Sequence, residues 1–221
     1  MRVALASTLR GTPLRDVADS AHLVLTDSPG SFPLVLTAPV DSAGRARFLA
    51  EASPERYVTS VEILSEEGVG WHREMLEPPE VAGPGLSDIL LYEPKGYDPP
   101  KSVLAAASTM YGSLDLEDVQ ELGVYWEVYG AGAETSVEHR LRIEREEGGF
   151  LDRIRQILPG GPEDASGTLS WQVPSTGTTS PVGIVLDIGS FSPGTYSLVL
   201  QSTWPGQPVL ERRVTFTINQ G

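Results

Sequence analysis

The chain has 221 residues, of which 40% are hydrophobic, and a formal net charge of −14 at pH 7. This surplus of acidic side chains argues against a nucleic-acid partner and against docking on anionic lipid, because both need clustered Lys and Arg. The sequence contains no Cys, which excludes disulfides, thiolate metal ligands and a Cys nucleophile.

No window approaches the roughly 20 apolar residues that a transmembrane helix needs, so we expect no membrane insertion. The first residues contain a short apolar stretch interrupted by Ser, Thr and Arg, which is a poor signal peptide. Either the protein stays where it is made, or the chain is a piece of a longer one. Whether Met1 is the native start stays open at this point.

The first part of the chain is predicted to form short antiparallel strands. Each run of β-forming residues is bounded by Gly, Pro, Ser or Asp. These runs are residues 3–8, 21–26, 33–37, 45–49, 57–64 and 70–75. Residues 10–18 are read as a loop. The segment 77–85 has three Pro and two Gly and is therefore the best linker candidate.

The linker predicts two domains, both β-sandwiches. The first spans residues 1–80 and can be incomplete at its N-terminus, and the second spans 81–221. Further strands are expected at 86–92, 122–129, 136–144, 167–173, 182–188, 195–201 and 209–218. Residues 150–158 carry apolar side chains at helical spacing and are read as a short helix or an irregular crossover.

The segment 192–200 combines a turn with a strand. Pro193 fixes its own φ and Gly194 permits a tight bend, so the pair delivers the following strand into a core. Tyr196 follows directly, and its position resembles the tyrosine corner of immunoglobulin-like and fibronectin-like sandwiches. We therefore expect Pro193, Gly194 and Tyr196 to be structural anchors.

A short internal repeat supports the two domains. Tyr57 follows a Ser-Pro pair as Tyr196 does, and the same offset of 196 − 57 = 139 residues carries Arg73 onto Arg212. Tyr57 is the corresponding anchor of the first domain. The predicted fold class is all-β, with two tandem immunoglobulin-like or fibronectin-III-like antiparallel sandwiches.

Several strand signatures recur in a known order. They include Leu-Ser-Asp-Ile-Leu-Leu at 86–91, Val-Tyr-Trp-Glu-Val-Tyr-Gly at 124–130 and the segment 192–200. This order resembles the C-terminal β-sandwich region of bacterial exported proteins with a Gly-Trp-x-Thr-Asp domain. The named domain is absent, since Gly70-Trp71 matches only its first two letters. The resemblance implies an extracytoplasmic module, periplasmic or exported, and carries over no catalytic residue.

Motifs for catalysis and for metals are weak. There is no Gly-x-Ser-x-Gly and no phosphate-binding loop, so an enzyme is not expected, although a hydrolase site assembled from loops stays an alternative. His22, His72 and His139 are far apart in sequence, which predicts partly exposed strand histidines and no metal.

An acidic cluster lies before the strand expected at 122–129. Its members are Asp115, Glu117, Asp118 and Glu121. The cluster lacks the calcium-loop pattern, and a solvated acidic turn is the default reading, but dispersed carboxylates can also hold Ca²⁺ and calcium binding stays open.

Two carboxylates lie in the middle of apolar strands. Glu62 is expected to face outward and to pair with an Arg such as Arg73 or Arg142. Along the other strand, alternation places Tyr125, Glu127 and Tyr129 on one face and Trp126 in the core on the other. We expect this trio to form the open face, and it is the candidate surface for a ligand or a partner.

The sequence thus predicts a non-enzymatic structural or protein-interaction module of a bacterial cell-envelope or exported protein. It needs no cofactor, and its partner is another protein or the rest of a longer polypeptide. The alternative is a carbohydrate-binding sandwich that stacks sugars on the face of Tyr125, Glu127 and Tyr129.

Overall fold

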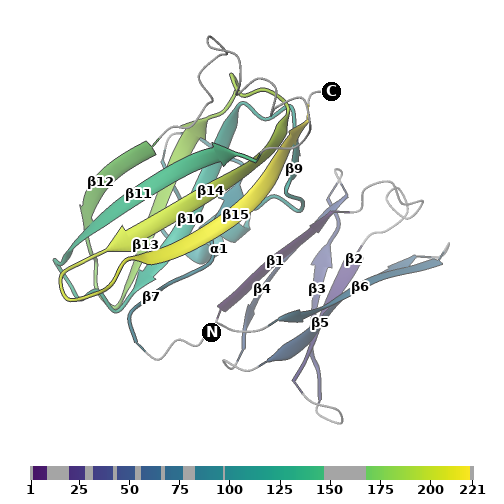
Figure 1. The fold of residues 1–221 in the computed structure, drawn as a ribbon. Helices are drawn as coiled ribbons and strands as arrows, with labels where there is room; N and C mark the ends of the chain where they lie inside the picture. The colour runs from purple at the N-terminus through teal and green to yellow at the C-terminus, as the bar shows by residue number, and fades with distance from the viewer. Residues whose placement is uncertain are drawn as a thin grey trace. The chain divides into compact units, whose positions relative to one another are not determined.

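The structure is a computed structural model in which the chain divides into two compact units. The described residues are 2–8, 20–27, 32–41, 44–52, 56–65, 68–76, 83–96, 98–146 and 168–219. Unit 1 consists of Met1–Val81 and Leu104–Ser113, and unit 2 of Ala82–Val103 and Leu114–Gly221 (Figure 1). The domain boundary placed between residues 80 and 81 stays a prediction. The expected loop 10–18, the helix or crossover 150–158, residues 53–55 of the first Ser-Pro turn and most of the linker lie outside the described residues.

Unit 1 contains two antiparallel sheets. Its strands are β1 (Arg2–Thr8), β2 (Ser20–Thr26), β3 (Leu34–Pro39), β4 (Arg45–Glu51), β5 (Tyr57–Ser65) and β6 (Gly68–Leu76). One sheet is β1-β4 and the other has the order β3-β2-β5-β6. Alternate side chains of β2, β4 and β5 are buried in a shared core that includes Leu23, Phe48, Tyr57 and Ile63. This is the period-two pattern of strands that bury one face.

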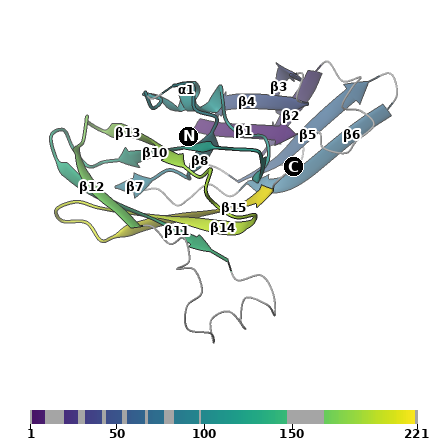
Figure 2. The same ribbon diagram turned by 90° about the horizontal axis from the view of Figure 1, so that it is seen from above.

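Unit 2 is a sandwich of two larger sheets. Its elements are β7 (Gly85–Leu86), β8 (Leu90–Tyr92), β9 (Asp115–Glu117), β10 (Glu121–Tyr129), β11 (Ser136–Arg145), β12 (Thr168–Pro174), β13 (Thr179–Asp187), β14 (Gly194–Thr203) and β15 (Leu210–Asn219). The first sheet has the order β13-β10-β7, with β8 also on β10, and the second the order β12-β11-β14-β15-β9. Figure 2 shows these sheets as two layers. The short helix α1 (Val103–Ala107) lies between β8 and β9 in sequence, and no helix among the described residues is long and apolar enough to cross a membrane.

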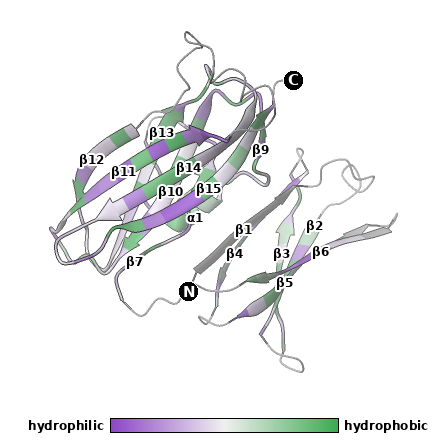
Figure 3. Ribbon diagram, in the orientation of Figure 1, coloured by the Kyte–Doolittle hydropathy of each residue, from purple (hydrophilic) through white to green (hydrophobic). Residues whose placement is uncertain are grey.

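The all-β fold class with immunoglobulin-like or fibronectin-III-like sandwiches is confirmed by the strand order. Strands β1 to β6 of unit 1 are arranged as β10 to β15 are in unit 2: the first pairs the fourth, and the third, second, fifth and sixth form the other sheet. Figure 3 shows apolar and polar residues alternating along β11. Every second side chain of this strand from Val137 to Ile143 is buried, so one face of β11 belongs to the core. The sequence missed β9 and α1, and the single strand expected at 86–92 is divided into β7 and β8.

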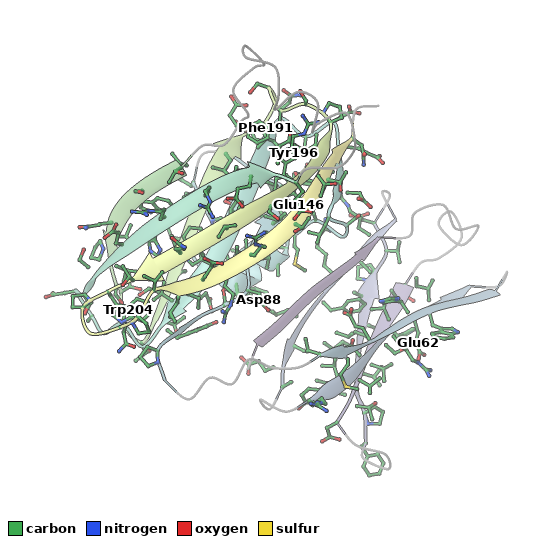
Figure 4. All side chains as sticks on the ribbon, viewed as in Figure 1. Glu62, Asp88, Glu146, Phe191, Tyr196 and Trp204 are labelled. Carbon is green, nitrogen blue, oxygen red and sulfur yellow. The ribbon has the colours of Figure 1, made fainter. Side chains whose placement is uncertain are left out.

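The Pro193-Gly194 turn holds Tyr196 at the end of unit 2, where Figure 4 shows Tyr196 close to Phe191. The Tyr196 hydroxyl donates a 2.7 Å hydrogen bond to the carbonyl oxygen of Ser192, which is the backward bond of a tyrosine corner. Gly194 has φ +154°, and a Cβ at this position would lie 3.0 Å from Nε of Arg145. The turn therefore requires Gly both for its backbone conformation and for the room that Arg145 occupies.

The two arginines related by the internal repeat do not have the same environment. Arg73 lies opposite Ser60 and points away from the core, whereas Arg212 lies opposite Leu200 on the core side. There Arg212 donates a 2.9 Å hydrogen bond to the carbonyl oxygen of Leu86 in the opposing sheet. The hairpin β14-β15 has a longer connection than β5-β6, and the register differs by one residue. A shift of one residue turns a side chain to the other face of a sheet.

The tyrosine corner predicts that Tyr196→Phe lowers the free energy of unfolding of unit 2 by about 1 kcal/mol, because the aromatic contacts stay and one hydrogen bond is lost. The measurement is urea denaturation followed by the fluorescence of Trp126, Trp171 and Trp204, all in unit 2. Tyr196→Leu, which also removes ring contacts to Phe191 and Phe216, is expected to cost more. Equal stability of wild type and Tyr196→Phe would contradict the structural role of the bond.

Candidate functional site

The trio of Tyr125, Glu127 and Tyr129 is brought together as alternation predicts. The Tyr125 hydroxyl donates to Oε1 of Glu127 and the Tyr129 hydroxyl donates to Oε2, both at 2.8 Å. One carboxylate thus accepts a hydrogen bond from each tyrosine on the same strand. Hydrogen bonds to an ionised acceptor are stronger than neutral ones, so the three side chains hold one another in place.

The expectation that this trio forms an open face is wrong for Tyr125 and Glu127, whereas Tyr129 is half-buried. Tyr125 is 2% exposed and Glu127 is 5% exposed. The reason is that this side of β10 is covered by residues of unit 2 itself. A Cβ at Gly123 would collide with the ring of Tyr92, and a Cβ at Gly183, which lies opposite Tyr125, would be 2.8 Å from Pro99. Because β10 is buried on both faces, alternation shows which residues share a face but not which face is wet.

The backbone around Glu127 is braced as well. Ser87, between β7 and β8, donates its N–H to the Glu127 carbonyl at 2.9 Å, and its hydroxyl oxygen accepts the Glu127 N–H at 2.8 Å. The Ser87 side chain therefore replaces a backbone acceptor of the sheet ladder where the first strand is interrupted. These contacts hold the trio together inside unit 2, and the burial of Tyr125 and Glu127 leaves no platform on which a sugar could stack across the trio.

His139 is the second buried polar group, and the expectation of a partly exposed histidine is wrong for it. Its side chain is fully buried, with Nδ1 2.8 Å from Oγ of Ser202. The rings of Trp126 and Trp171 lie 5.3 and 5.4 Å from the imidazole. Burial among these rings lowers the pKa of His139 to about 4, because the charged imidazolium is poorly solvated there. His139 is thus a neutral core residue, and Trp126 lies in the core as predicted.

The other predicted polar positions do not converge on a site. Within the described part of the chain, no group of three His, Asp or Glu side chains is arranged to hold a metal ion. Asp115 and Glu117 of the acidic cluster belong to β9, which pairs in parallel with β15, and are therefore part of a strand rather than a turn. The prediction of a turn is wrong for these two residues, and calcium binding by the cluster stays an open question.

Unit 1 presents a different surface, which we call the outer face. It is the side of the sheet β3-β2-β5-β6 opposite the core. Its members are Val24, Val35, Val58, Ser60, Glu62, Trp71, Arg73 and Met75, placed on one side by the register of the four strands. Trp71 is 66% exposed and Met75 is 56% exposed, and Val35 and Val58 are exposed as well. Large apolar side chains therefore gather on the solvent side of this sheet.

Polar contacts fix the centre of the outer face. Nη2 of Arg73 lies 3.7 Å from Oε1 of Glu62, which confirms the predicted cross-strand pair, and Glu62 is the labelled residue of unit 1 in Figure 4. The Ser60 hydroxyl donates to Glu62 at 3.0 Å and accepts from Nε of Arg73 at 3.3 Å. The guanidinium of Arg73 also lies 5.1 Å from the centre of the Trp71 ring, within cation–π range. Trp71 is thereby held in one orientation while it stays exposed.

The outer face is not evident from the sequence. A signal existed, since Val58, Ser60 and Glu62 alternate with the core residues of one strand, and Trp71, Arg73 and Met75 do so in the next. Alternation alone could not decide which set faces water, because both sets contain apolar residues. The second sheet of unit 1, which covers only the core side, decides it.

Comparisons with known proteins give remote likenesses. No protein-family model matches the sequence, and no curated protein matches it. Similar solved structures include a red sea bream transglutaminase (6% identity, TM-score 0.32, 93% of this chain and 27% of that chain). An E. coli alpha-2-macroglobulin has 14% identity and a TM-score of 0.31, over 99% of this chain and 13% of that chain. A tetra-tandem repeat from the extending region of a large adhesion protein has 11% identity and a TM-score of 0.27, over 99% and 50%.

The chain spans at most half the length of these three structures. The fold assignment rests on the strand order of each unit and not on these likenesses.

The Glu127 brace predicts a loss of stability when the carboxylate becomes an amide. Glu127→Gln is expected to lower the free energy of unfolding of unit 2 by about 1 to 2 kcal/mol, because one tyrosine hydroxyl then faces the amide NH2, which cannot accept its hydrogen bond, and the other faces a weaker, neutral acceptor. The matched control is Glu121→Gln, an exposed position on the same strand, which should change little. Equal effects of the two substitutions in urea denaturation would contradict the brace.

The buried imidazole predicts a pH dependence of stability. The unfolded chain binds the His139 proton near pH 6.5 and the folded chain only near 4. The contribution of His139 is therefore complete above pH 6.5 and is lost as the pH falls toward 4, by about 3 kcal/mol in total. His139→Phe should flatten the decline of the free energy of unfolding between pH 7 and 4.5, and His72→Gln, at an exposed position, should leave it unchanged. A decline that is identical in wild type and His139→Phe would show that this group does not contribute.

Proposed function

We propose that the chain is a non-enzymatic protein-interaction module and that the outer face of unit 1 is its binding surface. The observation that carries the proposal is the exposure of Trp71, Val58 and Met75 beside an Arg73 that is already held in place. Trp and Arg contribute much of the binding energy at protein interfaces, and apolar patches exposed on a sheet often mark such sites. Because Arg73 is already fixed by Glu62 and Trp71, little side-chain entropy remains to be lost on binding.

The distribution of titratable groups also supports a non-enzymatic role. Within the described residues, the side chains with shifted pKa values are Tyr92, His139 and Tyr196. Burial is the main cause for each of them. All three are packed inside unit 2, whereas a catalytic acid or base has to reach a substrate. The alternative of a hydrolase assembled from loops gains no support from these groups.

Carbohydrate binding would have to use Trp71 in place of the buried trio. A stacked sugar needs a free face of an aromatic ring, and the guanidinium of Arg73 lies over the ring of Trp71. A protein surface, which offers carboxylates and apolar side chains together, fits this combination better. Carbohydrate binding at Trp71 is therefore the alternative, and a polysaccharide array tests it.

We further propose that the module belongs to a bacterial exported or cell-envelope protein and acts outside the cytoplasm. The support is the resemblance of the strand signatures at 86–91, 124–130 and 192–200 to the sandwich region of such proteins. The partner is then another envelope protein or another part of a longer polypeptide. No cofactor is needed for this role.

The binding surface predicts that Val35→Glu combined with Val58→Glu abolishes the retention of partner proteins from an envelope extract of the source cells. Two carboxylates on the outer face would have to be desolvated in any interface formed there. The matched control is Leu169→Glu with Val209→Glu, two exposed apolar residues of unit 2. Mass spectrometry of the retained proteins provides the readout.

If both double variants retained the same proteins as the wild type, the outer face would not be the binding surface. Retention on a polysaccharide array that is lost in Trp71→Ala would instead support the carbohydrate alternative. Retention of nothing by the wild type in either assay would count against both.

A further inference from the structure

The two units differ at the edges of their sheets. In unit 2 the edge of β15 is covered by β9, which pairs with it over residues 217–219. The edge of β10 is covered by β7 and β8. The strand of unit 1 that corresponds to β15 is β6, and among the described residues it pairs only with β5 (Figure 1). Among the described residues β6 is therefore open over its whole length, Gly68–Leu76, whereas the edge of β15 is closed at one end.

Strand β6 has few of the features that block pairing at an edge. It has nine residues and contains no Pro, and its register with β5 runs without a bulge from Tyr57–Leu76 to Ser65–Gly68. Short edges, prolines, bulges and charged side chains are the usual means by which proteins protect an edge strand, and of these β6 has only the charges of Arg73 and Glu74. The side chains of Trp71, Arg73 and Met75 are more than half exposed, so the outer face of β6 is accessible, and no described strand other than β5 pairs with its backbone.

The register shows which backbone groups of β6 are free to pair. Residues opposite each other in an antiparallel ladder alternate between exchanging two hydrogen bonds and exchanging none. A two-residue hairpin connection closes on a hydrogen-bonded pair, here Ser65 and Gly68. Counting from this pair, Trp71, Arg73 and Met75 direct their N–H and C=O groups away from β5. These are the residues whose side chains lie on the outer face.

We propose that β6 pairs in antiparallel fashion with β6 of a second copy of this chain, with Arg73 on the two-fold axis. In this register Trp71 lies opposite Met75 of the other copy, and His72 lies opposite Glu74. Both pairs occur twice because the interface is symmetric. The first is an aromatic–thioether contact and the second places an imidazole opposite a carboxylate, on the side of the strand away from the outer face. The sheet then continues from one copy into the other by β-strand addition.

The like charges of the two Arg73 residues on the axis do not prevent this pairing. Each guanidinium lies 3.7 Å from a carboxylate oxygen of Glu62 in its own copy and over its own Trp71 ring. The net charge of −14 per chain opposes association at low ionic strength. Dimerisation is therefore expected to strengthen when salt rises from 20 to about 150 mM, because salt screens the repulsion.

The inference rests on the proposed function, since it names a second copy as a partner of unit 1. Its test can fail separately, because Val35 and Val58 lie on β3 and β5 and not on the open edge. Val35→Glu with Val58→Glu should leave dimerisation within about twofold of the wild type. A wild type that does not dimerise but still retains other proteins would overturn only this inference and leave the proposed function standing.

Cysteine cross-linking tests the register directly, because the chain contains no Cys. In the proposed dimer the two residues at position 73 are a hydrogen-bonded pair with Cα atoms about 5.5 Å apart, a distance that a disulfide can span. Arg73→Cys should form a covalent dimer under mild oxidation, and Val35→Cys, exposed on the same face, should not. Equal cross-linking of both variants would overturn the proposal.

Sedimentation equilibrium tests the role of the backbone edge. The wild type is expected to dimerise with a dissociation constant on the order of 10 to 100 µM, typical of a small interface. Arg73→Pro and Arg73→Ala both remove the guanidinium, but only Pro also removes the backbone N–H that points away from β5. Arg73→Pro should therefore weaken dimerisation at least about tenfold relative to Arg73→Ala. His72→Glu and Glu74→Lys should each weaken it, and the double variant should restore it. A wild type that stays monomeric at about 200 µM, or a double variant that shows no recovery, would overturn the proposed pairing.

Discussion

The structure depends on the requirement that each strand bury one set of alternate side chains against a second sheet. In unit 1 this requirement is met on one side only, so β5 carries Tyr57 and Ile63 in the core and Glu62 outside. In unit 2 the central strand β10 is buried on both faces from Leu122 to Val128. A strand of this kind has no solvent side, and its polar groups must find partners within the protein. Glu127 meets that condition through two tyrosine hydroxyls and Ser87.

The two units differ in how the edges of their sheets are paired. The strands β7 and β8 pair with the edge of β10, and β9 pairs with the end of β15, whereas the matching strands β1 and β6 have no such partners among the described residues of unit 1. Unit 2 also contains the buried imidazole and the tyrosine corner, which are features of a stable support. Unit 1 presents an exposed Trp71 next to an unpaired strand edge. The proposed binding surface and the more closely packed core thus lie in different copies of the same strand arrangement.

Small changes of register explain why similar sequences play different roles in the two units. Arg73 and Arg212 stand 16 residues after Tyr57 and Tyr196, yet one fixes an exposed tryptophan and the other ties the two sheets of unit 2 together. The difference is one residue of register between the two hairpins. A sequence repeat therefore locates corresponding strands reliably but does not transfer the role of a side chain that lies beyond a turn.

The sequence by itself determined the all-β class, most strand positions, the turn before Tyr196 and the outward position of Glu62 beside an arginine. These follow from local propensity, from the period of two and from turn residues whose backbone angles are restricted. The burial of Tyr125, Glu127 and His139 and the exposure of the outer face around Trp71 were decided only by the tertiary structure. Alternation divides the side chains of a strand into two sets, and the layers that pack on the sheet decide which of those sets meets water.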